Sequence, residues 1–138
     1  MYSIEKTPFG FKLTHRRNSS EATTRKWIAD VESLLEQHEG DFNVLVDMRA
    51  FIPVNREAFT AAQRGIQLAM KKGMKRVMVV TANPALSFQM KRLLGEAGGF
   101  EMSRFIDAKT SDDWAQKSIE WLANGVDPDK RTASLRAG

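Results

Sequence analysis

The sequence predicts a single α/β domain in which four helices cover a five-stranded, mostly parallel sheet. Short apolar runs of strand length alternate with longer segments whose apolar residues recur at helical spacing. The runs at 42–47 and 76–81 are almost continuously apolar, which is typical of strands buried on both faces of a parallel sheet. A length of 138 residues with 42% apolar and 28% charged residues is ordinary for one globular domain.

The chain opens with two short predicted strands, at 2–6 and 9–15. Apolar side chains at alternate positions of the second run indicate a strand, and the short connection favours an antiparallel pair. A helix follows, because Ser19 or Ser20 can accept hydrogen bonds from the free amides of its first turn. Its apolar stripe ends before Gly40, a residue that tolerates the left-handed conformation at a helix end.

The middle of the chain predicts two strand–helix units. The run at 42–47 leads through a loop into a helix at 56–72, and the run at 76–81 is followed at once by Asn83 and Pro84. An asparagine cap before a proline at the first helical position is a specific signal for a helix start. Strands that alternate with helices in this way demand a parallel sheet with right-handed crossovers.

The last part of the chain completes the order β-β-α-β-α-β-α-β-α. Two adjacent glycines end the third helix, a fifth strand is predicted at 100–106, and Ser111 is the expected cap of a fourth helix. We expect the domain to cover residues 1–125. The polar segment 126–138, which contains proline and glycine, is predicted to be a disordered tail.

Composition narrows the class of protein. Because the chain has no cysteine, disulfides, a thiolate nucleophile and cysteine-based metal sites are excluded. The first residues lack the apolar core of a signal peptide, and no apolar run approaches the roughly 20 residues of a membrane span. These features predict a cytoplasmic protein without a membrane span.

The net charge of +4 is unevenly distributed along the chain. Nine basic residues and one acidic residue lie between 49 and 92, so this segment is strongly basic and the remainder is acidic. A basic patch can attract anions, nucleic acid or an acidic partner, whereas solvated outer helix faces are the simpler interpretation. The basic residues lack interleaved aromatic residues and a docking motif, which argues against nucleic-acid binding.

Three runs carry a resemblance to a known family: LVDMRAF, GMKRVMVV and RFIDAKTSDDWAQKSIEWL. They make the chain similar, over about residues 2–124, to the SpoIIAA-like branch of the STAS superfamily. The resemblance implies a five-stranded, mostly parallel sheet backed by four helices. STAS domains occur in anti-sigma-factor antagonists and on sulfate transporters, and this branch is described alongside the Sec14 lipid-carrier fold. The resemblance therefore implies either a regulatory binding module or a carrier of apolar ligands.

Regulatory STAS domains carry a phosphorylatable serine or threonine at the start of the second helix. The matching segment here, 50–55, reads AFIPVN and contains no hydroxyl group. Thr60 is the nearest hydroxyl and lies a turn inside the predicted helix. A phosphorylation switch of the usual STAS type is therefore not predicted.

No residue pattern points to catalysis. His15 and His38 have no serine or acid at a spacing that suggests a triad, and we interpret both as surface residues. The glycines form no nucleotide-binding motif. We therefore predict a protein that is not an enzyme, with no catalytic residue and no cofactor.

Two aspartates, Asp47 and Asp107, each follow a predicted strand at the carboxyl edge of the sheet. If the strand at 76–81 separates them, they are about 10 Å apart. One metal ion cannot bridge that gap, because its oxygen ligands must lie within about 2 Å. We interpret both as structural, through a salt bridge to Arg49 or Lys109 or through capping, and we predict no metal site.

The favoured function is a non-catalytic binding module at this carboxyl edge. Predicted helix starts near residues 55, 83 and 111 converge there, and helix N-termini beside arginines suit an anion or an acidic partner. The apolar loop residues Phe51 and Ile52 must either be buried beneath the loop or contact a partner. We expect a protein partner or a small anion as the ligand. Formation of a homodimer is a further possibility. The predicted binding residues are Arg49, Phe51, Ile52, Asn55, Arg56 and Asn83.

The alternative is a Sec14-like carrier or sensor of a small apolar ligand or lipid. Methionine fills irregular space, so several methionines together with the apolar loop could line an adaptable pocket. Ordinary core filling is the competing interpretation of those methionines. A cavity beneath the loop at 49–55 would favour the carrier. The candidate lining residues are Met48, Phe51, Ile52, Met70, Met78, Met90 and Met102.

Overall fold

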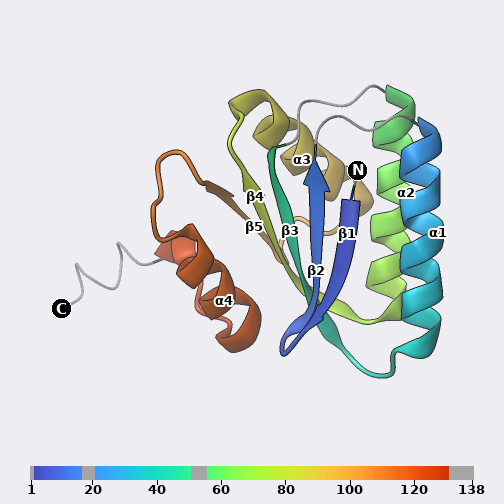
Figure 1. Cartoon of the computed structure of the whole chain (residues 1–138). Helices are drawn as coiled ribbons and strands as arrows, with labels where there is room; N and C mark the ends of the chain where they lie inside the picture. The colour runs from blue at the N-terminus through green and yellow to red at the C-terminus, as the bar shows by residue number, and fades with distance from the viewer. Residues whose placement is uncertain (1, 17–20, 51–55, 131–138) are drawn as a thin grey trace.

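The computed structural model describes residues 2–16, 21–50 and 56–130 (Figure 1). It has the predicted order of strands and helices in one α/β domain, followed by a short 3-10 helix. The elements are β1 (Tyr2–Thr7), β2 (Gly10–Arg16), α1 (Glu21–Gln37), β3 (Phe42–Ala50), α2 (Arg56–Lys72), β4 (Met74–Thr81), α3 (Pro84–Ala97), β5 (Ser103–Asp107), α4 (Trp114–Asn124) and η1 (Pro128–Lys130).

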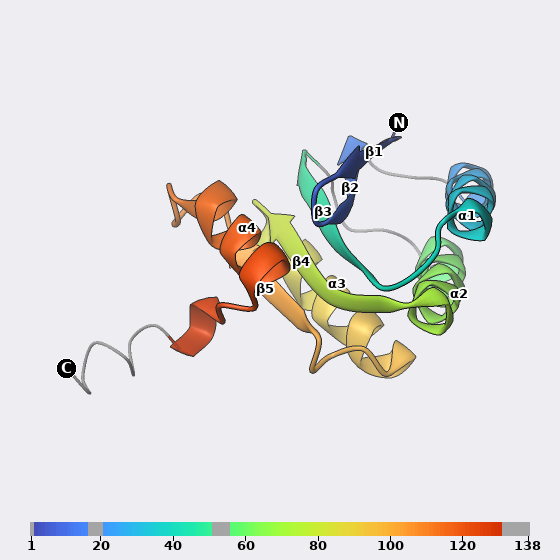
Figure 2. The same ribbon diagram turned by 90° about the horizontal axis from the view of Figure 1, so that it is seen from below.

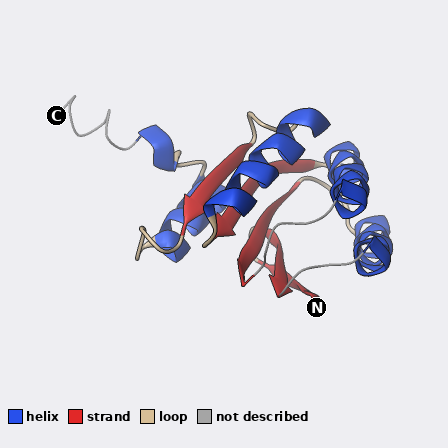
Figure 3. Cartoon of the chain, turned by 90° about the horizontal axis from the view of Figure 1, so that it is seen from above, coloured by secondary structure: helices blue, strands red, loops and turns tan. Residues whose placement is uncertain are grey.

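The five strands form one sheet in the order β1-β2-β3-β4-β5. Strand β1 is antiparallel to β2 and every other neighbouring pair is parallel, which confirms the mostly parallel sheet. Because the order never reverses and right-handed crossovers are the rule, the helices that connect parallel strands fall on the same face. Figures 2 and 3 show α1, α2 and α3 on that face and α4 on the other.

The ends of the helices are set by local signals. The side chain of Asn83 accepts a hydrogen bond of 3.1 Å from a backbone amide in the first turn of α3, and Pro84 begins that helix. The helix ends at Gly98, whose φ of 90° lies in the left-handed region that favours glycine. The predicted cap of the last helix is wrong, because α4 starts after Asp113, which makes no side-chain cap, rather than after Ser111.

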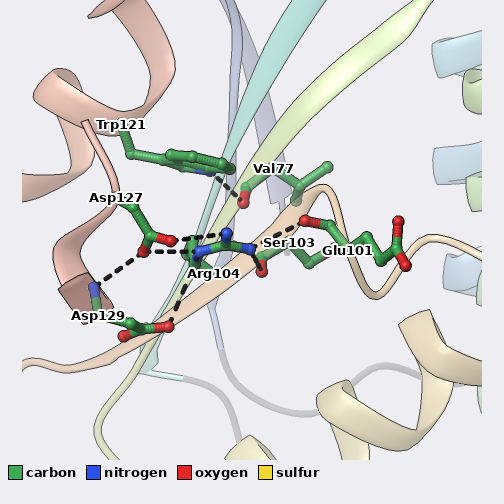
Figure 4. Close-up of polar contacts among 7 residues, drawn as sticks. All are labelled: Val77, Glu101, Ser103, Arg104, Trp121, Asp127 and Asp129. Carbon is green, nitrogen blue, oxygen red and sulfur yellow. Dashed lines mark hydrogen bonds and ion pairs between the residues drawn. The ribbon is translucent and has the colours of Figure 1, made fainter. Parts of the chain in front are cut away.

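The described fold continues past the predicted domain boundary at residue 125. Asp127 accepts two hydrogen bonds of 2.9 Å from the Arg104 guanidinium, and the Asp129 carboxylate lies 3.7 Å from the same group (Figure 4). Asp127 and Asp129 therefore contact β5, and the domain boundary at residue 125 stays a prediction. The remaining part of that predicted tail, 131–138, lies outside the described residues.

Apolar side chains form a separate core on each face of the sheet. The smaller core lies under α4, where Trp121 and Leu122 pack on Met78 and neighbouring strand residues. Met78 and Leu122 are completely buried, and the Trp121 indole donates a hydrogen bond of 3.1 Å to the carbonyl of Val77. The larger core lies between the sheet and α1, α2 and α3, and it contains the candidate site.

Candidate functional site

A cavity lies within the larger core, between the sheet and its helices. Its volume is about 110 Å³, and its walls come from β1 to β4, from the inner faces of α1 and α2, and from α3. His15 and Trp27 are the described lining residues whose side chains carry nitrogen atoms. Figure 2 shows the enclosing elements, with α1 and α2 facing the curved sheet.

The sheet forms one wall of the cavity through the alternation of its side chains. Val44 and Met48 of β3 point to this face, because successive strand residues point to opposite sides. Leu45, which follows Val44, belongs to the core under α4. The same period of two brings His15 to the cavity, two residues after Leu13 of β2.

The cavity exists because α2 presents small residues to it. Ala62 and Ala69 lie about two turns apart on the inner side of the helix and leave volume that larger side chains would fill. At Gly65 helix α1 comes so close that an added Cβ would lie 3.3 Å from Cζ3 of Trp27 and 3.1 Å from Cγ1 of Ile28.

Two polar side chains meet in the cavity wall. The imidazole of His15 and the indole of Trp27 lie edge to face, with their ring centroids 5.2 Å apart. Burial lowers the pKa of His15 to about 4, so its imidazole is neutral near pH 7. The Nε1–H of Trp27 is buried, and no acceptor among the described residues reaches it. A buried donor without a partner costs about 1–3 kcal/mol of folding stability.

A third polar ring borders the same core. His38, which follows α1, packs edge-on against Phe11 and Phe42, with centroid distances of 5.3 and 5.4 Å. Both phenylalanines line the cavity, and Nε2 of His38 is buried without a partner in the described part of the chain. The prediction that His15 and His38 are surface residues is therefore wrong. For His15 a signal existed, because it continues the inward alternation of Phe11 and Leu13.

A contact between β1 and α1 lies beside the cavity. The hydroxyl of Tyr2 donates a hydrogen bond to the carboxylate of Asp30. Burial and this contact raise the pKa of Tyr2 to about 12. Ile4 of β1 and Val31 of α1, the neighbours of this pair, line the cavity. The hydrogen bond therefore ties α1 to the edge strand of the sheet.

The predicted binding edge is occupied by internal contacts. Arg49 forms a two-pronged ion pair with Asp47, at 3.0 and 2.9 Å, and its guanidinium carbon lies 4.2 Å from the centre of the Trp114 ring. Asp47 is 4% exposed, and this burial by itself raises the pKa of its carboxyl group. The hydrogen bonds and the charge of Arg49 outweigh burial, so the pKa of Asp47 is lowered. Asp107 accepts a hydrogen bond of 2.9 Å from the Lys109 amide. Asp47 thus makes the predicted ion pair with Arg49, whereas Asp107 contacts the backbone amide of Lys109 and not its ammonium group.

The other predicted binding residues do not form a common site among the described contacts. Asn83 is used as the cap of α3, and Arg56 lies exposed at the start of α2. Phe51, Ile52 and Asn55 lie outside the described residues. The anion or partner site at this edge therefore stays a prediction.

The methionines divide between the two roles considered for them. Met48 and Met90 line the cavity, as the carrier interpretation expects. Met78 is completely buried in the opposite core, and Met70 and Met102 pack against the larger core. Most of the cavity wall consists of other aliphatic and aromatic side chains.

Two further findings concern metals and membranes. Within residues 2–16, 21–50 and 56–130, no group of three or more histidine, cysteine or acidic side chains is placed to hold a metal ion. None of the helices in this part of the chain combines the length and the apolar character needed to cross a membrane.

Comparison with known proteins bears on the fold. No family model matches the sequence, and no curated protein sequence matches it. Among solved structures, the chain is similar to an uncharacterized protein of the DUF3478 family from Shewanella loihica PV-4, described as having a SpoIIAA-like fold. The TM-score is 0.62 and the identity is 15%, with 88% of this chain and 92% of that chain covered. At this identity the likeness shows the fold alone, and it confirms the SpoIIAA-like fold that the sequence resemblance implied.

Proposed function

We propose that this chain binds a small, mainly apolar ligand in the cavity between the sheet and helices α1 and α2. The observation behind the proposal is about 110 Å³ of unfilled, almost wholly apolar space within the larger core. Apolar cavities in proteins stay dry and take up apolar molecules, and one of roughly 150 Å³ holds benzene. The ligand, or the part of it that enters, therefore has about the size of a small ring.

The site is proposed to bind without catalysis. Among the described lining residues, His15 is the one titratable side chain, so this part of the wall offers no acid–base pair and no hydroxyl or carboxylate nucleophile. Removal of apolar surface from water, at roughly 25 cal/mol per Å², supplies most of the affinity. This corresponds to a carrier or sensor, which releases its ligand unchanged.

A partner-binding module at the carboxyl edge has less support. Arg49, the central predicted residue there, is already paired with Asp47 and placed over Trp114. An incoming anion would have to compete with a buried carboxylate for the same guanidinium. Binding in the cavity requires no such exchange, so the cavity is the better-supported site.

Filling the cavity tests the proposal. Ala69→Leu adds atoms inside the cavity, whereas Ala123→Leu adds the same atoms at an exposed position of α4. Toluene should raise the melting temperature of the native chain and of Ala123→Leu, because a ligand that binds only the folded state stabilises it. Ala69→Leu should show little or no shift. An equal toluene shift in all three proteins, or none in the native chain, contradicts the proposal.

Native mass spectrometry of gently purified protein addresses the natural ligand. An added mass that is present on the native chain and on Ala123→Leu, but missing from Ala69→Leu, identifies a molecule held in the cavity. A bare-chain mass for the native protein counts against a tightly bound cellular ligand.

A further inference from the structure

Methionine side chains reach the cavity wall from two strands and a helix. Met74 lies at the start of β4, Met48 lies near the end of the parallel strand β3, and Met90 comes from α3; all three line the cavity. Each keeps accessible surface, 5% for Met48 and Met74 and 8% for Met90, whereas Met78 in the opposite core keeps none. A methionine has three rotatable bonds and a polarizable sulfur, so its side chain can adapt to a ligand.

Aromatic rings line the same cavity. Phe11 of β2 and Phe42 of β3 meet edge to face, with their centroids 5.5 Å apart and their planes at 78°. Phe42 is also the register partner of Met74 on β4. Aromatic rings pack well at centroid distances of about 4.5–7 Å, and a methionine sulfur packs well about 5 Å from a ring. The wall therefore contains both kinds of side chain that pack most favourably against an aromatic ring.

An aromatic ligand gains more from such a wall than an aliphatic ligand does. An aromatic ring has a negative face and a positive edge, and its contacts with sulfur and with other rings are favourable beyond the burial of its surface. A saturated ring of the same size gains chiefly from that burial. Among the described lining residues no side chain is charged near pH 7, because burial lowers the pKa of His15 to about 4. A charged substituent on the ring would therefore be buried without a partner, which is strongly unfavourable.

We propose that the ligand of this cavity is a small, uncharged aromatic ring, and that Met48, Met74 and Met90 select it over aliphatic rings of the same size. The inference rests on the proposed function, because it names the class of ligand for the same cavity. The three methionines lie on both sides of the space, since two belong to the sheet and one to the helices that cover it. A bound ring thus meets sulfur from more than one direction.

A matched pair of probes tests the preference. Toluene and methylcyclohexane have the same carbon skeleton, but only toluene is aromatic. Methylcyclohexane is the more hydrophobic of the two, so it would bind more tightly if burial of apolar surface alone set the affinity. Isothermal titration calorimetry of the native chain should instead give the smaller dissociation constant for toluene. Equal or tighter binding of methylcyclohexane contradicts the proposal.

Substitution of single methionines tests which residues select the ring. Met48→Leu and Met90→Leu each remove a sulfur from the wall and change the side-chain volume little. Each should weaken toluene binding about threefold more than methylcyclohexane binding. Met78→Leu makes the same change in the opposite core and should leave the ratio of the two dissociation constants unchanged. If the wall variants weaken both probes equally, or if Met78→Leu changes the ratio as much, the methionine contact is wrong.

The native chain provides a second readout that needs no substitution. In a ¹H–¹³C spectrum of protein with labelled methionine methyl groups, the ring current of bound toluene should move the resonances of Met48, Met74 and Met90 and leave that of Met78 nearly in place. Methylcyclohexane, which has no ring current, should move them much less. If both probes bind and move these resonances alike, the cavity binds ligands but does not place an aromatic ring against the methionines. If neither probe binds the native chain, the proposed function fails as well.

Discussion

Arg104 of β5 lies over Trp121 of α4, with its guanidinium carbon 4.3 Å from the centre of the ring (Figure 4). The same guanidinium donates hydrogen bonds to the carboxylate of Asp127 and to the carbonyls of Glu101 and Ser103. One side chain thus joins an edge strand, the helix that covers it and the segment that follows that helix.

Asp127→Asn should lower the free energy of unfolding by about 1–3 kcal/mol, because it removes the charge from two partly buried hydrogen bonds. Urea unfolding at pH 7 measures the change. Asp112→Asn, at an exposed position before α4, is the matched control and should stay within about 0.5 kcal/mol of the native chain. Equal effects of the two substitutions would mean that the contact with Arg104 contributes nothing.

A chain that ends at residue 125 should melt at a lower temperature than one that ends at residue 130. The shorter chain lacks Asp127 and Asp129 and leaves the guanidinium of Arg104 without either carboxylate. Circular dichroism of the two chains, heated under the same conditions, measures the difference. Identical melting temperatures would mean that these contacts do not stabilise the fold and would support the predicted domain boundary at residue 125.

The buried imidazole of His15 should make the fold sensitive to mild acid. Its pKa of about 4 in the folded chain lies below the ordinary value of 6.5. Between these values the unfolded chain binds more protons, so this stability is present at pH 7 and is lost as the pH falls toward 4. At pH 4.5 the loss amounts to roughly 2–3 kcal/mol. Urea unfolding at pH 7 and pH 4.5 measures it, and His15→Phe should remove most of the difference. The same pH dependence in both chains would assign the acid sensitivity elsewhere.

Removal of the Arg49 charge should leave a buried carboxylate without its partner. Arg49→Gln is expected to cost about 1–3 kcal/mol at pH 7, a range reduced because the arginine side chain is 46% exposed. Because Arg49 lowers the pKa of Asp47, the cost should shrink as the pH falls below 3.8 and the carboxyl group gains a proton. Arg56→Gln, exposed at the start of α2, is the control in urea unfolding. Equal costs for the two arginines would contradict a stabilising ion pair.

Much of the fold could be predicted from signals that are local in the sequence. Asn83 with Pro84 marked the start of α3 and Gly98 its end, because caps depend on neighbouring residues. Apolar runs predicted β3 and β4 for the same reason. The contact between Arg104 and Asp127 could not be predicted in this way, because the two residues are 23 apart in the sequence and their pairing depends on how α4 returns over the sheet.

The candidate site was harder to predict. The sequence predicted an apolar stripe on the first helix but interpreted His15 as a surface residue, although His15 continues the alternation of Phe11 and Leu13. A cavity is a property of three-dimensional packing, since it depends on which side chains face Gly65 across the core. No local pattern contains that information. The loop on which the predicted binding edge depended lies outside the described residues.

The small residues on the inner side of α2 also give this protein a volumetric property. A cavity of about 110 Å³ corresponds to roughly 66 mL per mole of protein, and unfolding eliminates such internal voids. High hydrostatic pressure should therefore favour the unfolded chain more strongly than it would for a core without the cavity. A molecule bound in the cavity fills that volume, so unfolding of the occupied protein no longer eliminates it. A weaker effect of pressure on unfolding would then show that the cavity is occupied, whatever the chemistry of the bound molecule.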